Sequence, residues 1–365
     1  MQLDFFPSRT LTLYMARLFI ARIIAMLAVL VLVLMALDLL GKTGDILAVP
    51  GNGQDEILTY VGLRVPQLIA SFMPYSVLLA TLITLVTLNQ NSEVIAMKAA
   101  GLSAHQVLAP LLLTAALVSV ASFAFNERVV TRATATLKAW EGNDFGPVPQ
   151  DSGERSNVYF TDGTNIFMAQ RLTGSGKATQ MEGVTWYSRD PQGLLAEQVK
   201  AERATYAAPG WKLVGVETFD VATAASGEKP ELVVGEGITL EQIELDKVDA
   251  DAQSFFALSE SINAYEAAGR RTSELRAKWW HKISGPLAAF LMPLLGSVAA
   301  FGLARSGALL LRAIIGMALG FAYFVVDNAV LAMGSFGGYP PFLAAWAPFF
   351  LFLLIGETVL IRTEE

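Results

Sequence analysis

Three charged side chains lie at the ends of long apolar runs, where a charged group is costly unless it has a partner or a function. Lys42 follows the first run, and its ammonium suits either an interfacial anchor or a contact for an anionic lipid headgroup. Asp38 and Asp327 are carboxylates, which inside a membrane often mark transport paths or proton relays. Asp327 would lie about 27 Å along its helix at about 1.5 Å per residue. That depth puts Asp327 near the interface, so a structural hydrogen-bonding role suits it at least as well as a transport role. The sequence leaves a structural or gating role open for both carboxylates.

The polar loop between the second and third apolar runs has the pattern of a short helix over residues 92–101. Ser92 is a typical N-cap residue, and Gly101 is a typical stop signal. Such a helix would expose four side chains: Glu93, Val94, Met97 and Lys98. A short capped helix between two spans is either an inert connector or a docking element for a soluble partner.

The sequence offers no constellation for catalysis or metal binding. Gly41-Lys42-Thr43 looks like the end of a phosphate-binding loop, but Ala36 stands where that motif requires a glycine. The metalloprotease and serine-hydrolase motifs are also missing. The chain has no cysteine and only two histidines, His105 and His281. We therefore expect no catalytic residue, no metal site and no cofactor, and no ATP hydrolysis by this chain itself.

Long apolar runs dominate the chain and must position these groups. The sequence is 53% hydrophobic and 16% charged, below the soluble norm of about 25% charged residues. A bilayer core about 30 Å thick is crossed by about 20 helical residues. Six runs meet this need, the first when it is extended back through Ala16: Ile23–Leu37, Val65–Ser92, Ala99–Asn126, Ile283–Leu303, Leu309–Leu331 and Phe342–Leu360. The pattern predicts six transmembrane helices, three on each side of a polar insert.

Two glycines in the fifth run, Gly316 and Gly320, form a small-xxx-small face. Such a face allows two helices to approach closely in a membrane. The partner helix belongs either to the same chain or to another subunit, and the sequence leaves both possibilities open.

The insert has the pattern of an all-β domain. Short runs rich in β-formers, such as Val184–Tyr187 and Trp211–Val214, alternate with turn signals such as Pro209-Gly210. This spacing favours a sandwich or jelly roll. Residues 141–251 carry 19 acidic and nine basic side chains, and a surface of that sign excludes nucleic acid as a partner.

Charge next to the spans predicts which way the chain crosses the membrane. Three arginines against one aspartate precede residue 23, which favours a cytoplasmic N-terminus. Alternation then places residues 89–105 and the C-terminus in the cytoplasm and the β insert outside. Five cations before the fourth span run against this rule: Arg270, Arg271, Arg276, Lys278 and Lys282. Because the translocation of a long domain is largely insensitive to loop charge, the predicted orientation stands.

From Leu13 to Arg362 the chain resembles the LptF/LptG family of lipopolysaccharide export permeases, and within it the LptG branch. The stretch Asn91–Gly101 is similar to the coupling helix of the family. Five further segments carry the likeness: Asn126-Glu127, Trp280–Ile283, Pro286-Leu287, Gly320–Asp327 and Pro340-Pro341. The β insert matches in position and size more than in its residues.

The resemblance implies a fold and a set of partners. The fold is an α-helical bundle of six transmembrane helices with a periplasmic β-jelly-roll between the third and fourth. The implied domains are residues 1–126 with the coupling helix 92–101, the β domain 127–258, and residues 259–365. The implied partners are an LptF-like permease subunit, an LptB-like cytoplasmic ATPase dimer, an LptC-like single-span protein and lipopolysaccharide. The location is the inner membrane of a Gram-negative bacterium, with both termini cytoplasmic.

The family's functional residues carry over in part. Glu93 matches the coupling-helix glutamate that contacts the ATPase, and Met97 and Lys98 share that helix. Lys42 matches one of several lysines that line the cavity near the phosphates of the substrate. The neighbouring lysine positions are occupied here by uncharged residues: Met35, Gly41 and Gln67. The phosphate contact is therefore weaker in this chain or is supplied elsewhere.

The expected function is that of a non-enzymatic permease subunit of an ABC-type lipopolysaccharide extractor, which feeds a periplasmic bridge toward the outer membrane. One rival is a membrane-anchored assembly or sensor protein whose β domain binds a partner. A second rival is an ion-coupled secondary transporter that uses Asp38 and Asp327. The centres of the spans lack charges, which weighs against the second rival.

Overall fold

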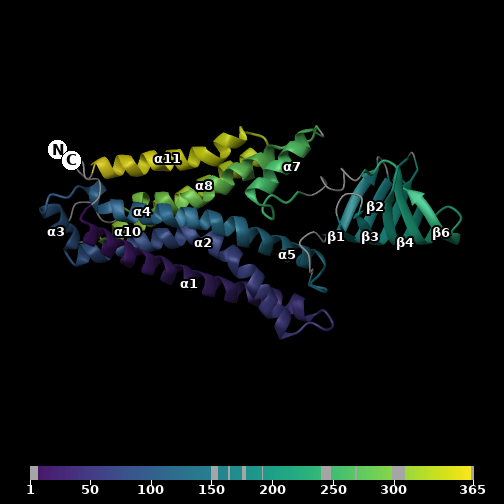
Figure 1. Ribbon diagram of the computed structural model, residues 1–365, viewed down its shortest axis with the longest axis horizontal. Coiled ribbons are helices and arrows are strands. Elements are labelled where there is room, and N and C mark those ends of the chain that lie inside the picture. The colour runs from purple at the N-terminus through teal and green to yellow at the C-terminus, as the bar shows by residue number, and fades with distance from the viewer. Residues whose placement is uncertain are drawn as a thin grey trace. The chain divides into compact units, whose positions relative to one another are not determined.

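The computed structural model describes residues 7–148, 155–162, 165–174, 178–190, 192–239, 248–267, 269–297 and 309–362. The chain divides into two compact units. The helical unit comprises Met1–Gly41, Arg64–Thr131 and Ser254–Glu365, and the β unit comprises Lys42–Leu63 and Arg132–Gln253. The helices are α1 (Arg9–Leu47), α2 (Gln54–Gln90), α3 (Glu93–Ala99), α4 (Ala104–Phe125), the π-helix η1 (Asn126–Val130), α5 (Thr131–Gly142), α7 (Phe255–Ala267), α8 (Ser273–Gly296), α10 (Leu309–Ser335) and α11 (Pro341–Arg362) (Figure 1).

Five helices in the described part of the chain are long and apolar enough to cross a membrane: Arg9–Leu47, Gln54–Gln90, Ala104–Gly142, Ala313–Ser335 and Pro341–Arg362. They confirm the predicted helical membrane domain with a β insert between its third and fourth spans. The fourth predicted span, Ile283–Leu303, begins inside α8, and its last residues lie outside the described ranges.

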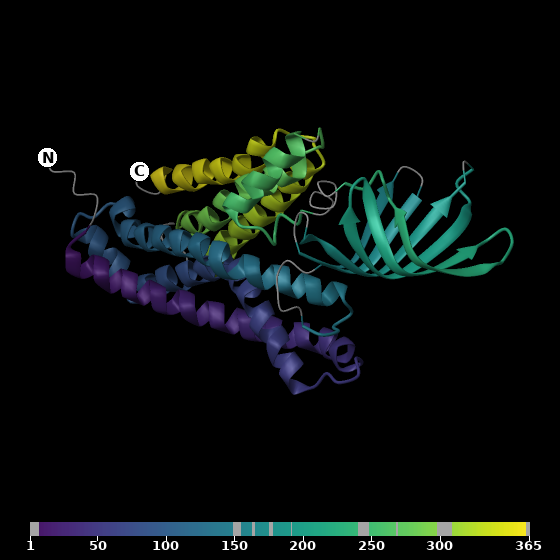
Figure 2. The same ribbon diagram turned by 45° about the vertical axis from the view of Figure 1, so that its right-hand side comes forward.

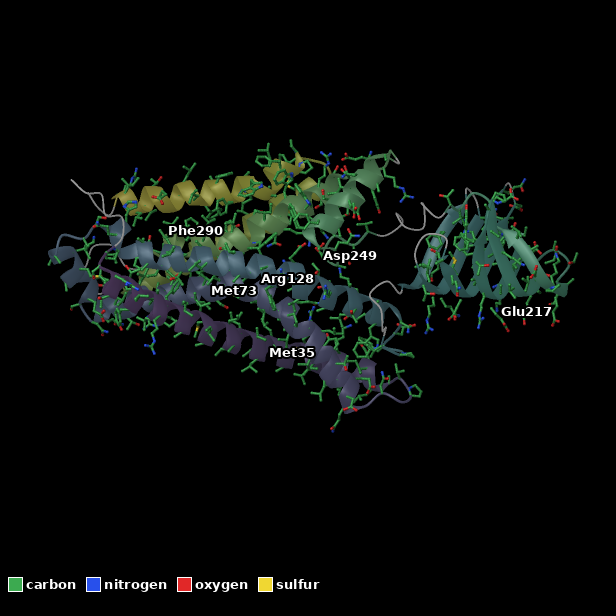
Figure 3. The ribbon with its side chains drawn as sticks, viewed as in Figure 1. Met35, Met73, Arg128, Glu217, Asp249 and Phe290 are labelled. Carbon is green, nitrogen blue, oxygen red and sulfur yellow. The ribbon has the colours of Figure 1, made fainter. Side chains whose placement is uncertain are left out.

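Helix α8 forms the centre of the helical unit, where it packs against α4, α10 and α11. Leu291, Met292 and Leu295 of α8 are fully buried in one apolar cluster with residues of the surrounding helices. Met73 of α2 and Phe290 of α8 pack against this cluster while remaining partly exposed (Figure 3).

Gly316 and Gly320 of α10 are where that helix approaches α2 of the same chain. A Cβ atom on Gly320 would overlap a terminal methyl of Leu78, and one on Gly316 would lie 3.0 Å from a methyl of Leu82. Both pairs are spaced by four residues, so two leucines of α2 fill the groove that two glycines leave on α10. The small-xxx-small face therefore serves helix packing within the chain.

The two ends of the insert meet at Glu127 in η1. Its carboxylate oxygens accept hydrogen bonds from the Phe255 backbone N–H at 2.9 and 2.7 Å, although the two residues are 128 positions apart. Phe255 opens α7, so Glu127 satisfies a backbone donor that a helix N-terminus leaves unpaired. The Phe255 ring also stacks on Trp279 of α8, with the ring centroids 4.6 Å apart. These contacts join the place where the chain leaves the helical unit to the place where it returns.

Six strands in the described ranges of the insert form one antiparallel sheet in the order β1-β2-β3-β4-β5-β6. They are β1 (Arg155–Asp162), β2 (Asn165–Thr173), β3 (Gln180–Arg189), β4 (Leu195–Ala207), β5 (Gly210–Asp220) and β6 (Ser226–Val234). Neighbouring strands lie about 4.8 Å apart, so β2 and β5 would be about 14 Å apart in a flat sheet. The rings of Phe167 and Trp211 on those strands nevertheless approach to 6.3 Å between centroids. The sheet is therefore strongly curled, as Figure 2 shows.

The concave face of this curled sheet carries the core of the β unit. Phe160 and Phe167 are paired across β1 and β2, and both belong to the buried cluster. Tyr159 precedes Phe160 in β1, so its side chain lies on the opposite face of the sheet, where it is half exposed. The predicted all-β insert is thus confirmed, and its described strands follow one another as a meander rather than crossing between two sheets.

We expect Gly320→Ala to destabilise the helical unit, because the new methyl would meet Leu78, which is itself buried. Overpacking of this kind costs about 1–3 kcal/mol. Gly62→Ala in α2 is the matched control, because no atom lies within 4 Å of a Cβ placed there. Helix propensity should make that control neutral or more stable by up to about 1 kcal/mol. Thermal unfolding in detergent measures both, and equal melting temperatures for the two variants would contradict the packing argument.

Candidate functional site

Gly101 stops helix α3 as predicted, but the N-terminal end of the helix lacks the side-chain cap expected from Ser92. Gly101 adopts a φ of +89°, and the Leu102 N–H donates to the Met97 carbonyl oxygen at 3.1 Å, which is a Schellman closure. Ser92 occupies the N-cap position in a left-handed conformation, and its side chain makes no capping hydrogen bond. Ser92 therefore occupies the predicted N-cap position, but its hydroxyl does not cap the helix.

The face that α3 exposes also differs from the prediction. Val94 and Met97 are buried in the core cluster of the helical unit, so the expectation that they face solvent is wrong. They lie three positions apart and form the short apolar stripe that anchors a helix of seven residues. Ile95 is 54% exposed on the other face, and Lys98 is exposed as well.

The Glu93 carboxylate at the start of α3 already has polar contacts. It accepts a hydrogen bond from the Asn91 amide at 3.2 Å and one from the Tyr14 hydroxyl of α1. In Figures 1 and 2, α3 lies at the end of the helical unit where α1 begins and α11 ends. The short helix and both ends of the described chain are therefore on one side of the bundle.

Lys42 lies inside α1, five residues before that helix ends at Leu47. Its ammonium nitrogen is 5.6 Å from the centroid of the Phe145 ring and 3.9 Å from the Asp45 carboxylate. The Asp45 side chain is largely exposed, and solvent weakens such a pair. Gly41, Lys42 and Thr43 are all helical, whereas a phosphate-binding loop needs a loop between a strand and a helix.

Asp38 is held between α1 and α2. Its carboxylate accepts a hydrogen bond from the Arg64 guanidinium at 3.1 Å, and the same guanidinium donates to the Gln67 side-chain oxygen at 2.7 Å. Both charges of this pair are partly buried. Asp38 is therefore paired with a cation, which suits a structural role.

Asp327 is buried, with 6% of its surface exposed. One carboxylate oxygen lies 3.9 Å from the His281 imidazole of α8, and the other has no hydrogen-bond partner among the described residues. The Tyr323 hydroxyl, one turn away on α10, also lacks a partner among them. His281 in turn lies 3.3 Å from the Ser284 hydroxyl. Asp38 and Asp327 belong to separate polar contacts, α1 with α2 and α8 with α10.

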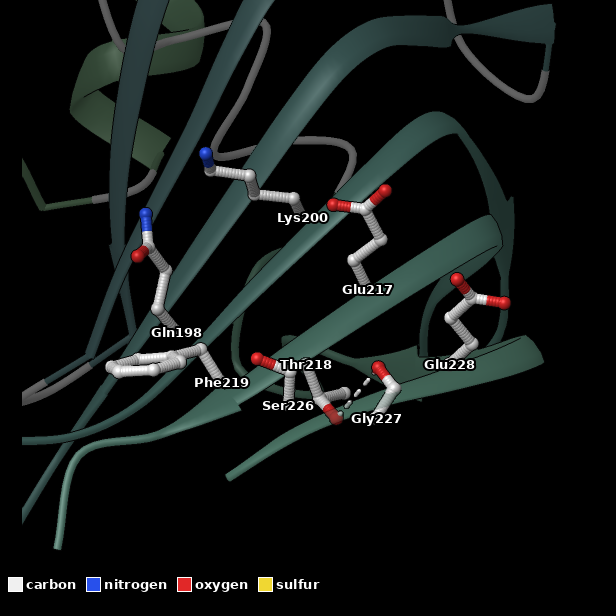
Figure 4. Close-up of a pocket in the computed structure, with 8 residues that line it drawn as sticks. All are labelled: Gln198, Lys200, Glu217, Thr218, Phe219, Ser226, Gly227 and Glu228. Carbon is white, nitrogen blue, oxygen red and sulfur yellow. Dashed lines mark hydrogen bonds between the residues drawn. The ribbon is translucent and has the colours of Figure 1, made fainter. Parts of the chain in front are cut away.

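A surface hollow of about 740 Å³ lies on β4, β5 and β6 (Figure 4). Lys200 is paired across the strands with Glu217, which is in turn paired with Glu228. One lysine beside two carboxylates does not suit a phosphate-bearing ligand. Within the described residues, no group of three or more His, Asp or Glu side chains is placed to hold a metal ion.

Sequence reasoning overlooked four residues that shape these sites. Ser103 and Gln106 form a reciprocal capping box at the start of α4, and their spacing is a recognisable signal. Asn52, in the turn between α1 and α2, hydrogen-bonds the Phe145 carbonyl at 2.8 Å across 93 positions. Phe145 itself holds a left-handed φ of +57°. A long-range contact of this kind leaves no local pattern in the sequence.

Comparison with known proteins covers nearly the whole chain. The model of the family described as lipopolysaccharide export system permease LptF/LptG matches residues 13–362. The lipopolysaccharide export system permease protein LptG of Escherichia coli strain K12 is 25% identical over 329 residues, covering 88% of this chain and 90% of the relative. LptG of Haemophilus influenzae is 23% identical over 333 residues, covering 86% and 89%. Because the family model matches almost the full length of this chain, the chain belongs to the LptF/LptG family.

Proposed function

We propose that this chain is the permease subunit of an ABC-type transporter that extracts lipopolysaccharide from the inner membrane of a Gram-negative bacterium. The observation that carries the proposal is the family match over residues 13–362, which includes the helices on both sides of the β insert. The relatives named LptG are permeases of lipopolysaccharide export. The partners we infer from this family are an LptF-like second permease, an LptB-like ATPase dimer and an LptC-like single-span protein.

Extraction needs work from outside this chain. Withdrawing an acyl chain from the bilayer loses about 0.8 kcal/mol of burial per CH₂ group. A cytoplasmic ATPase is the proposed source, and α3 is the proposed docking element. Its support is the exposed Ile95 and Lys98 beside the anchored Val94 and Met97. Met97 then acts by anchoring the helix, while Glu93, Ile95 and Lys98 meet the partner.

Lys42 is the proposed contact for an anionic group of the lipid. It is a partly exposed cation near the end of α1, on the helix end opposite the one beside α3. In the proposed orientation this end faces the periplasm, as does the β domain of residues 127–258. An ammonium there attracts phosphate without the directional demand of a guanidinium fork.

The β domain is proposed to receive the acyl chains before they pass to a periplasmic bridge. The support is the apolar concave face of the curled sheet, with Phe160 near its β1 edge. Phe167 and Trp211 fill the interior deeper in the curl, so acyl chains must displace or bypass these rings.

The two rival functions fit the structure less well. An ion-coupled transporter would need Asp38 and Asp327 on a shared path, whereas they lie in separate contacts with Arg64 and His281. A membrane-anchored assembly or sensor protein differs from the proposed permease in that it would bind no cytosolic ATPase. Co-purification of a cytosolic ATPase with the full chain, followed by an export assay, separates these functions.

Glu93→Ala and Ile95→Glu should each reduce ATPase co-purification and lipopolysaccharide export, because they alter the exposed surface of α3. Truncation of an important interface side chain typically loses more than about 1 kcal/mol, or about fivefold in affinity. Val94→Ala is the matched control, since it should lower thermal stability through lost packing more than it weakens docking. Undiminished pull-down and export in both surface variants would exclude α3 as the docking element.

Lys42→Glu should impair export most, Lys42→Ala less and Lys42→Arg least, because only the first adds repulsion to the loss of attraction. A cation near an anionic lipid surface contributes about 1 kcal/mol, or about fivefold in binding. Lipopolysaccharide release from proteoliposomes measures the order, and raised salt should narrow the differences. Lys200→Glu in β4 controls for charge reversal at an exposed lysine elsewhere. If the three Lys42 variants are equally active, Lys42 is an interfacial anchor.

A photo-crosslinking phenylalanine analogue at Phe160 should capture lipopolysaccharide only when the assembled transporter hydrolyses ATP. The same analogue at Tyr159 is the matched control, because adjacent strand residues face opposite sides of the sheet and Tyr159 is on the exposed side. Gel mobility of the crosslinked protein, detected with an antibody against lipopolysaccharide, gives the readout. Crosslinks at Tyr159 alone would identify the sheet as a scaffold rather than a conduit.

A further inference from the structure

The segment after α5 holds an unusual backbone conformation next to Lys42. Asp144 and Phe145 are consecutive non-glycine residues with φ values of +48° and +57°. Residues other than glycine rarely adopt this left-handed backbone conformation, and they keep it only where the surrounding structure holds them in it. The Phe145 N–H donates to the Trp140 carbonyl at 3.0 Å, and the Trp140 indole N–H donates to the Gly146 carbonyl at 2.7 Å. The bend is therefore closed by hydrogen bonds on both sides of Phe145.

Asn52 ties this bend to the end of α1. Its side-chain amide donates to the Ile46 carbonyl at 3.0 Å and to the Phe145 carbonyl at 2.8 Å. Both acceptors are main-chain atoms, so the contact fixes backbone rather than a particular side chain. Asn52 thus holds the last turn of α1 beside the backbone of Phe145. Lys42 lies one helical turn before Ile46 on the same helix.

Two further aromatic rings fix the orientation of the Phe145 ring. Phe145 is 5% exposed, and it meets Trp140 edge-on at 5.4 Å and Tyr60 edge-on at 6.2 Å between centroids. Trp140 and Tyr60 are themselves buried. The ring therefore offers a fixed surface to the Lys42 ammonium, 5.6 Å from its centroid, while the lysine side chain stays 40% exposed.

A ring and a carboxylate hold a cation in different ways. A buried carboxylate paired with Lys42 would neutralise its charge, whereas Asp45, 3.9 Å away, is largely exposed and screened by solvent. An aromatic face attracts the ammonium through its quadrupole and leaves the positive charge in place. The ammonium has three N–H donors, which remain available for phosphate or carboxylate oxygens. A cation already held in position loses less conformational freedom when a ligand binds.

We propose that Phe145 is a positioning residue for Lys42: the ring, fixed by Trp140, Tyr60 and the Asn52 hydrogen bonds, holds the ammonium ready for an anionic group of the lipid. The functional part of this inference rests on the proposed role of Lys42 in lipopolysaccharide extraction. The positioning part rests only on contacts within the β unit and is tested separately.

The first measurement is the acylation rate of the Lys42 amine in the assembled transporter, read by peptide mass spectrometry relative to Lys200. Phe145→Leu keeps an apolar side chain but removes the ring, so it should release the amine and raise the relative rate about two- to fivefold. Phe145→Tyr keeps the ring and should leave the rate unchanged. Asn52→Ala removes the hydrogen bond to the Phe145 carbonyl and should also raise the relative acylation rate of Lys42. This variant replaces Phe145→Leu in the test if Phe145→Leu does not accumulate in the cell. An unchanged ratio in both Phe145→Leu and Asn52→Ala overturns the proposal.

The second measurement is a double-mutant cycle in the export assay. When Lys42 is present, Phe145→Leu should lower export about two- to fivefold. In a Lys42→Ala background, the same substitution should have no further effect. An equal loss in both backgrounds would mean that Phe145 acts through stability alone, which overturns the positioning role. If the labelling ratio changes while neither Phe145→Leu nor Lys42→Ala alters export, the positioning stands and the proposed substrate contact fails.

Discussion

Close helix approach at glycine is the contact on which the helical unit depends. Lipid tails are as apolar as the side chains they surround, so helices in a membrane gain little from the hydrophobic effect and must pack at short range. Four close approaches meet this need: Gly320 of α10 at Leu78, Gly334 of α10 at Ala344, Gly296 of α8 at Thr81, and Gly356 of α11 at Leu294. They join α2, α8, α10 and α11, and leave no room for an added methyl without movement.

This packing explains how the helical unit can present the proposed ATPase partner with a defined surface. Helix α3 is too short to be stable by itself, because isolated helices below about 12 residues are marginal in water. Val94 and Met97 place it on the core of the helical unit, and the Schellman closure at Gly101 sets where α4 begins. In the proposed coupling role, a force on Ile95 or Lys98 would therefore act on packed helices rather than on a loop without packing contacts.

The membrane spans were predictable because hydrocarbon excludes charge, so the uncharged runs Val65–Ser92 and Ala99–Asn126 appear directly in the sequence. Helix ends were less predictable: α1 runs from Arg9 to Leu47, well beyond the predicted apolar run. Strand β4 was not predicted, because Leu195–Ala207 is rich in alanine and charged residues that favour helices. Its pairing with both β3 and β5 overrides that local preference.

The candidate sites show the same division between local and long-range signals. Gly101 was recognisable as a helix stop, since its left-handed conformation is a property of the residue type. The burial of Val94 and Met97 depends on which side of α3 meets the bundle, and seven residues hold too little periodicity to say so. Asn52 and Phe145 are joined across 93 positions, so only the folded chain reveals their contact.

The distribution of cations gives the contact between Lys42 and Phe145 its significance. At two positions where the resemblance implies further lysines, this chain has Met35, which is buried, and Gln67, which accepts a hydrogen bond from Arg64. Arg64 does not replace a missing lysine, because Asp38 neutralises its charge. Among the residues that the structure describes, Lys42 forms its ion pair with Asp45, which is largely exposed and screened by solvent. In the proposed substrate contact, affinity for an anionic headgroup depends on holding Lys42 in place, and the buried Phe145 ring can do so without cancelling the charge of the ammonium.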